Sequence, residues 1–212
     1  MKIASEVAQN LLSINAIKLS PEKPFTWASG LKSPIYCDNR IVLSYPAARS
    51  IVINAFKEKS VGFEGFDTIA GVATAGIPHG ALLAQALNLP FIYVRSKAKG
   101  HGRQNQIEGR VTGSEKVLVI EDLISTGGSC LKAVDALRNE GCEIVGVLAV
   151  FSYGFEKAKD AFKAANCPFD TLSNYPVLLE EALKSGYISA QNEATLKEWN
   201  QDPKAWSDRH TE

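Results

Sequence analysis

Short apolar segments alternate with helical patterns through most of this chain, and that alternation constrains the fold more than any other feature. Each apolar segment has the near-continuous hydrophobicity of a strand buried on both faces; they are DTIAGVA (67–73), PFIYVR (90–95), KVLVIE (116–121), EIVGVLAVF (143–151) and FDTL (169–172). Helical spacing follows in 78–88, 129–141 and 154–166. Strands joined by helices in this way form parallel sheets. We therefore predict an α/β fold, with a parallel central sheet flanked by helices.

The two ends of the chain have different patterns. Ile3, Val7, Leu11 and Ile14 lie on one face of a predicted N-terminal helix. The next segment, 20–40, is rich in Pro, Gly and Ser and predicts short strands and turns in a small subdomain. We expect a helix and small subdomain in 1–45, a core in 46–175 and a helical tail in 176–212.

Composition excludes several classes of protein. The 212 residues carry 23 Lys and Arg against 23 Asp and Glu, so no overall field favours nucleic acid or a membrane surface. The longest apolar run, 144–151, is far shorter than the roughly 20 residues that span a bilayer. The four cysteines have neither CxxC spacing nor a nearby His, which favours reduced, buried thiols. We predict a cytoplasmic protein without nucleic-acid or membrane partners.

Two acids and a glycine-rich turn end the strand of 116–121. Ligands of parallel sheets bind at the carboxyl ends of strands, which is where Glu121, Asp122 and the turn STGGS (125–129) are expected. The acids can accept hydrogen bonds from sugar hydroxyls, and the backbone N–H groups of the turn can hold a phosphate at the start of a helix. A ribose 5-phosphate fits both halves. The alternative is an ordinary turn with Ser or Thr as helix cap.

The segment 95–110 is a polar, glycine-rich loop with five Lys and Arg residues against one Glu. A loop of this length is often a lid over a bound ligand. The alternative interpretation of this segment is a solvated basic hairpin.

Three segments of the chain together resemble a known family. VLVIEDLISTGGS (117–129) is similar to the phosphoribosyl pyrophosphate motif of type I phosphoribosyltransferases, and R-x-x-x-K-x-H-G (95–102) resembles the catalytic loop of the orotate phosphoribosyltransferases. FTWASGLKSPIYCDNR (25–40) resembles the hood that covers the base in that family. The resemblance spans about residues 15 to 155 and implies the type I phosphoribosyltransferase fold with an N-terminal hood.

The resemblance also implies an activity and roles for single residues. A pentosyltransferase of this family transfers ribose 5-phosphate from phosphoribosyl pyrophosphate to orotate, with Mg2+, in pyrimidine (UMP) biosynthesis. Lys99, His101 and Asp122 would be catalytic, and Lys99 and His101 would act on the partner's site in a homodimer. Phosphoribosyl pyrophosphate would be bound by those three residues together with Arg95, Glu121, Leu123, Ile124, Ser125, Thr126, Gly127, Gly128 and Ser129.

Orotate would be bound by Ser125, Tyr36 and Arg40. The alternatives are core packing for Tyr36 and a surface ion pair for Arg40. Some relatives carry Lys where this chain has Ala28, Ala75 and Ser96. His79 is expected to be a structural or surface residue, and the tryptophans of the tail are expected to pack between helices.

Two other functions share parts of this pattern. A phosphoribosyltransferase for a purine or for uracil would keep the acid pair but lack the K-x-H-G loop. A regulator that senses phosphoribosyl pyrophosphate would lose loop cations or gain a nucleic-acid domain. The loop favours the orotate enzyme.

Overall fold

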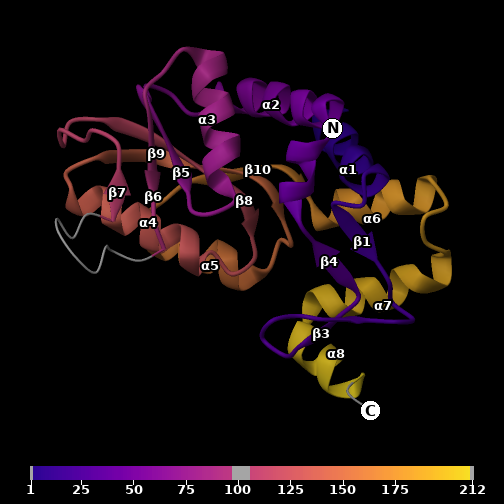
Figure 1. Ribbon diagram of the computed structural model, residues 1–212. Coiled ribbons are helices and arrows are strands. Elements are labelled where there is room, and N and C mark those ends of the chain that lie inside the picture. The colour runs from indigo at the N-terminus through magenta and orange to yellow at the C-terminus, as the bar shows by residue number, and fades with distance from the viewer. Residues whose placement is uncertain (1, 97–105, 211–212) are drawn as a thin grey trace.

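A six-stranded sheet forms the centre of the molecule. The computed structural model describes residues 2–96 and 106–210. The strand order is β10-β9-β8-β5-β6-β7, and all neighbours are parallel except β6 and β7 (Figure 1). The strands are β5 (Thr68–Val72), β6 (Phe91–Val94), β7 (Ile107–Glu108), β8 (Lys116–Ile124), β9 (Glu143–Ser152) and β10 (Phe169–Asn174). The parallel central sheet is thus confirmed.

Helices cover both faces of the sheet. Successive side chains of a strand point to opposite sides, so each buried strand contributes apolar residues to two cores. Leu118 and Ile120 of β8 belong to a core shared with α2 (Pro46–Ser60) and α3 (Gly76–Leu87). Val117 and Val119 belong to a second core with α4 (Gly128–Asn139) and α5 (Glu156–Ala164). These pairs of helices lie above and below the sheet in Figure 1.

Short strands form the hood. After α1 (Lys2–Ser13), β1 (Ile17–Leu19) pairs with β4 (Ile35–Cys37), and β2 (Phe25–Thr26) pairs with β3 (Lys32–Ser33). A 3-10 helix, η1 (Asn39–Ser44), then contacts β8 and leads to α2. The hood therefore ends directly beside the strand that carries the acid pair.

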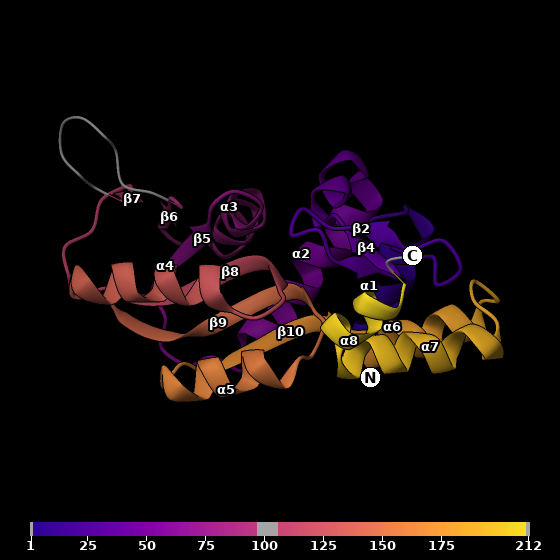
Figure 2. The ribbon, with the colours of Figure 1, turned by 90° about the horizontal axis from the view of Figure 1, so that it is seen from below.

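Three helices complete the chain: α6 (Tyr175–Lys184), α7 (Ala190–Gln201) and α8 (Pro203–Arg209). Figure 2 shows α7 and α8 on the hood side of the molecule, away from α4, and α8 contacts β3. Trp199 and Trp206 are fully buried, so the expected packing role of these residues is confirmed. Because α1 packs on β10 and α8 on β3, contacts cross both expected boundaries, and the division at residues 45 and 175 stays a prediction.

Several local expectations change in the structure. The strand of 116–121 does not stop at the acid pair but continues to Ile124, because β9 pairs with it as far as Ser152. Part of the predicted loop forms β7, which pairs with β6. All four cysteines are free. Cys130, Cys142 and Cys167 are buried as expected, whereas Cys37 is half-buried, so the expectation is wrong for this residue. Within residues 2–96 and 106–210, no helix is long and apolar enough to cross a membrane.

Candidate functional site

The topology of the sheet creates a crevice at the carboxyl ends of β5 and β8. The chain continues from β5 to β6 on one side, and β8 lies on the other side of β5. Neighbouring strands whose connections run in opposite directions leave such a crevice, where ligands of these sheets bind. A cavity of about 320 Å³ lies here, named below the acidic cavity. It is lined by Cys37, Asp38, Arg40, Ala73, Thr74, Ala75, Glu121, Asp122, Leu123 and Ser129.

The acid pair occupies consecutive positions of β8 in different surroundings. Both residues line the cavity, but Glu121 is only 5% exposed, whereas Asp122 is half-buried. The Asp122 N–H donates to Glu121 Oε1 at 3.0 Å. Burial raises the pKa of Glu121 well above its usual range, and the negative charge of Asp122 raises it further. No Lys or Arg of the described chain forms an ion pair with either carboxyl group.

Asn39 fixes the backbone of the acid pair from the hood. Its Nδ2 atom donates to the carbonyl oxygen of Asp122 at 2.7 Å, and the residue is fully buried. Sequence reasoning missed this residue. Its partner is 83 positions away in the chain, and no local pattern points to such a contact.

The turn 125–129, named below the phosphate turn after the role expected from the sequence, follows directly after β8. Gly127 has φ 81, and a Cβ atom there would lie 2.8 Å from the Phe162 ring, so glycine is required for both reasons. Helix α4 begins at Gly128, and its cap residue, Gly127, provides no side-chain hydrogen bond to the first turn. The alternative of an ordinary Ser or Thr cap is therefore wrong. The free N–H groups of this turn suit an anion.

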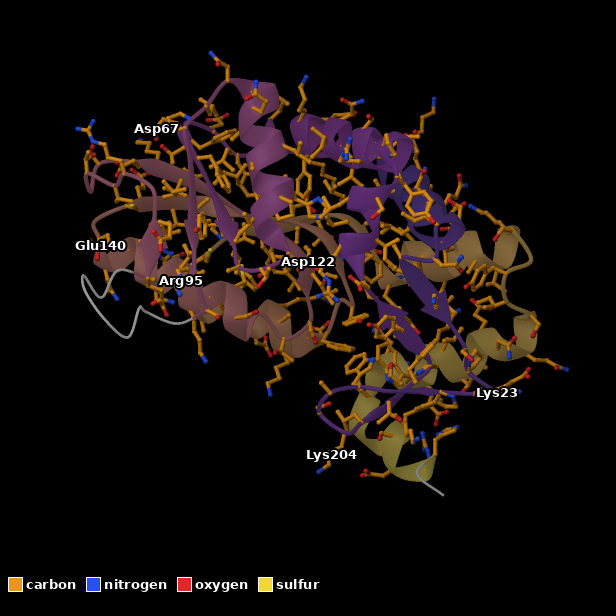
Figure 3. The ribbon with its side chains drawn as sticks, in the orientation of Figure 1. Lys23, Asp67, Arg95, Asp122, Glu140 and Lys204 are labelled. Carbon is orange, nitrogen blue, oxygen red and sulfur yellow. The ribbon has the colours of Figure 1, made fainter. Side chains whose placement is uncertain are left out.

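A second cavity, of about 350 Å³, adjoins the first one and shares Ala73 and Ser129 with it. We name it the basic cavity, because its charged lining residues are Arg95 and Lys132. Arg95 lies 3.6 Å from Glu108, and its Nη1 atom is buried without a hydrogen-bond partner in the described residues. Figure 3 shows Arg95 at the end of β6, and Asp122 between the sheet and the hood.

Other predicted residues are placed as follows. Leu123 borders the acidic cavity, whereas the Ile124 side chain is buried in the core. Ser125 and Thr126 line a third cavity, on the hood side of the turn. Lys99 and His101 lie outside the described residues.

The two hood residues predicted to bind orotate differ in their surroundings. Arg40 lines the acidic cavity, but its guanidinium makes two hydrogen bonds to Asp38, at 2.7 and 2.9 Å. These bonds lower the pKa of Asp38. Tyr36 is 40% exposed, and its ring centroid lies 5.7 Å from that of Phe25. Core packing therefore does not describe Tyr36, while the surface ion pair of Arg40 is present. Binding of orotate by either residue stays a prediction.

His79 is a buried residue of α3. Its side chain is inaccessible, and burial lowers the pKa of the imidazole. Its ring packs 6.2 Å from that of Phe56. Of the two expectations for this residue, the structural one is confirmed and the surface one is wrong.

Known proteins resemble the chain over nearly its whole length. The model of the phosphoribosyl transferase domain family matches residues 40–175. The orotate phosphoribosyltransferase of Cutibacterium acnes is 54% identical over 210 residues, which are 99% of this chain and 97% of that protein. This chain belongs to the orotate phosphoribosyltransferase family.

Solved structures agree with this family in fold. The orotate phosphoribosyltransferase of Aeropyrum pernix superposes with a TM-score of 0.74 at 28% identity, over 86% of this chain and 99% of that one. The UMP synthase of Leishmania donovani gives a TM-score of 0.78 at 28% identity, and this chain spans 42% of that longer protein. The type I phosphoribosyltransferase fold expected from the sequence is therefore confirmed.

Proposed function

We propose that the adjoining acidic and basic cavities transfer ribose 5-phosphate from phosphoribosyl pyrophosphate to orotate, giving orotidine 5′-monophosphate and pyrophosphate. The observation that supports this most directly is the separation of charge between them. Three carboxyl groups and one already paired guanidinium line the acidic cavity. The basic cavity has Arg95 and Lys132 and no carboxylate among those lining residues that the structure describes.

This separation suits the charges of the transition state. When the bond between ribose C1 and pyrophosphate breaks, positive charge builds on the sugar and negative charge on the leaving oxygens. Groups already positioned to oppose such charges lower the barrier. The breaking bond would lie near Ala73 and Ser129, which the two cavities share.

Glu121 and Asp122 would hold the ribose. Asp122 borders the cavity, so its carboxylate can accept hydrogen bonds from ribose hydroxyls and face the positive charge on the ring. Glu121 would contribute mainly by orienting Asp122, because its carboxyl group accepts a hydrogen bond from the Asp122 N–H. Asn39 holds the same peptide from the other side, which limits the movement of Asp122.

The residues from Leu123 to Ser129 would hold the 5′-phosphate. The uncapped first turn of α4 supplies N–H groups, and the hydroxyls of Ser125, Thr126 and Ser129 can donate further hydrogen bonds. Leu123 and Ile124 would contribute through the backbone.

Arg95 would bind the leaving pyrophosphate in the basic cavity. By family resemblance, Lys99 and His101 would join it from the partner subunit of a homodimer. Cations that close over the departing group stabilise its charge and exclude water.

The residues present fit Mg2+ as a companion of pyrophosphate. No group of three or more acidic, His or Cys side chains suited to a metal occurs in the described parts of the chain. An ion held mostly by substrate oxygens and water needs no such cage, and the carboxylate of Asp122, which lines the acidic cavity, would be available to it. When bound, Mg2+ neutralises and orients the pyrophosphate.

Orotate would lie at the hood end, near Ser125, with Tyr36 and Arg40 as candidate contacts. A cytoplasmic location fits an enzyme of pyrimidine biosynthesis.

The first test is an absorbance assay of orotate consumption with phosphoribosyl pyrophosphate and Mg2+. We expect turnover by the wild type and a loss of about 100-fold or more in kcat/KM for Asp122→Asn and Lys99→Ala. Asp135→Asn, an exposed site on α4, is the matched control and should keep full activity. Turnover of uracil or a purine instead of orotate would identify another transferase. No turnover with any base would favour a sensor.

The cross-subunit role can be tested with the same variants. In a heterodimer of Lys99→Ala and Asp122→Asn, one site combines an intact acid pair with an intact partner loop. Random co-assembly would therefore restore about a quarter of the wild-type activity in a symmetric dimer. A loop that served its own subunit would restore none.

A further inference from the structure

A third cavity, of about 520 Å³, lies on the hood side of the phosphate turn. We name it the tail cavity, because residues 200–204 of the C-terminal helices form one wall. Trp27 comes from the hood, Ser125 and Thr126 from the turn, and Gly154 from the end of β9. The proposed position of orotate, next to Ser125, is therefore bordered by a part of the chain outside the family match to residues 40–175.

Direct contacts fix this wall to the hood and the core. Asn200 Nδ2 donates to the carbonyl oxygen of Tyr153 at 2.7 Å, one residue before Gly154. The Ser207 hydroxyl accepts a hydrogen bond from the Lys32 N–H at 2.9 Å. Trp199 packs edge-on against the rings of Trp27 and Tyr153, with centroids 5.8 and 5.5 Å away. A shift of α7 or α8 would move the hood and the end of β9 together.

The acidic side chains that line the tail cavity already have partners, whereas two of its lysines form no ion pair with a described residue. Glu156 is paired with Lys159 at 2.5 Å, and Asp202 caps α8 by accepting a hydrogen bond from the Ala205 N–H at 2.9 Å. Lys157 and Lys204 also line the cavity, and neither forms an ion pair with any described residue. Lys204 extends from the start of α8 beside the hood (Figure 3).

Resting on the proposed function, we propose that the C-terminal helices form part of the orotate site, with Lys204 attracting the orotate carboxylate and Asn200 as a positioning residue. An aromatic wall at Trp27 and an unpaired cation suit a flat, anionic base. Arg40 is the less suitable cation, because Asp38 already accepts two hydrogen bonds from the Nε and Nη2 edge of its guanidinium.

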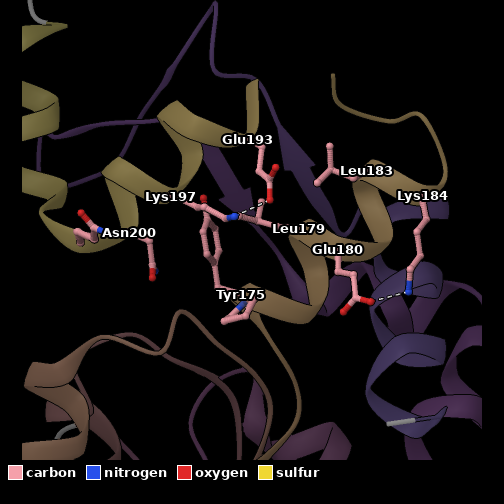
Figure 4. Close-up of a pocket in the computed structure, with 10 residues that line it drawn as sticks. Tyr175, Leu179, Glu180, Leu183, Lys184, Glu193, Lys197 and Asn200 are labelled. Atoms are coloured by element: carbon pink, nitrogen blue, oxygen red, sulfur yellow. Dashed lines mark ion pairs between the residues drawn. The ribbon is translucent and has the colours of Figure 1, made fainter. Parts of the chain in front are cut away.

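A groove of similar size between α6 and α7 does not offer the same chemistry. Its Lys184 and Lys197 are paired with Glu180 and Glu193, at 2.7 and 2.6 Å (Figure 4). Asn200 stands at the edge of both cavities. Lys197 therefore provides a matched control on the same helix as Asn200.

The test compares Lys204→Ala and Asn200→Ala with Lys197→Ala and the wild type. For each protein, kcat, the KM for orotate and the KM for phosphoribosyl pyrophosphate are measured, together with Tm. Loss of one charge-assisted contact at an exposed site should raise the KM for orotate about 3- to 10-fold in Lys204→Ala. Asn200→Ala should also raise the KM for orotate. The KM for phosphoribosyl pyrophosphate should change less than about twofold in both, and Lys197→Ala should match the wild type.

Uracil, which lacks the carboxylate, gives a second measurement. Lys204→Ala should reduce the preference for orotate over uracil by the same 3- to 10-fold, and a purely structural role would leave this ratio unchanged. A selective rise in the KM for orotate with either variant supports the proposal. Unchanged values in both variants, or equal rises in both KM values, overturn it. Absence of orotate turnover by the wild type would instead refute the proposed function itself.

Discussion

Gly71, in β5, lies directly against the start of helix α3, and replacing it by Ala should disturb both the fold and the site. A Cβ atom at this position would lie 2.8 Å from Ile77 Cα and 2.9 Å from the carbonyl oxygen of Gly76. Both are backbone atoms, so no side chain can rotate away. Because carbon atoms pack at roughly 3.5–4.0 Å, the start of α3 must move by about 0.7–1.2 Å.

This movement has a calculable effect. Overpacking of a core costs about 1–3 kcal/mol. For a chain of this size, each kcal/mol lost from the free energy of unfolding lowers Tm by about 2–4 °C. The Tm of Gly71→Ala should therefore be about 2–12 °C lower than that of the wild type. Helix α3 begins just after Ala73 and Ala75, and both of these residues line the acidic cavity. A displacement of about 1 Å in such a site can cost 100-fold in rate, and we expect kcat/KM to fall by up to that amount.

Thermal unfolding followed by circular dichroism and the orotate assay would measure both effects. Gly62→Ala is the control, because its Cβ atom would meet only the carbonyl oxygen of Lys59 at 3.4 Å, an ordinary contact. If Gly71→Ala keeps its Tm within about 1 °C and its kcat/KM within about twofold of the control, the argument from close packing is refuted.

Three further substitutions test the supports of the site. Asn39→Leu removes the buried hydrogen bond to the Asp122 carbonyl and should cost about 1–3 kcal/mol in urea unfolding. The pKa of Glu121 is raised in the folded state, so its contribution to stability is present at low pH and is lost as the pH rises through the folded pKa. Glu121→Gln should therefore raise Tm at pH 8 and have less effect at pH 5, and the opposite trend would contradict the assigned burial. Trp199→Ala removes a fully buried ring and should cost about 3–5 kcal/mol by the same urea measurement.

Much of the fold could be predicted from local patterns. The apolar run of β9 is long enough to identify a buried strand without knowledge of its partners, and the spacing of α4 shows a helix with one apolar face. The limits of β8 could not be predicted in this way. Glu121 and Asp122 interrupt the apolar pattern, and they stay in the strand because β9 pairs at Glu121 through Ala149 and beyond the acids at Leu123 through Phe151.

The sequence by itself determined the chemistry of this protein: a basic loop, an acid pair and a glycine-rich turn in this order along the chain. These features depend on residues close together in the sequence, where spacing and side-chain type are sufficient. Only the tertiary structure decided that Asn39 holds Asp122 and that Asn200 holds Tyr153. Such contacts join distant segments, and they depend on how the sheet, the hood and the last helices pack together.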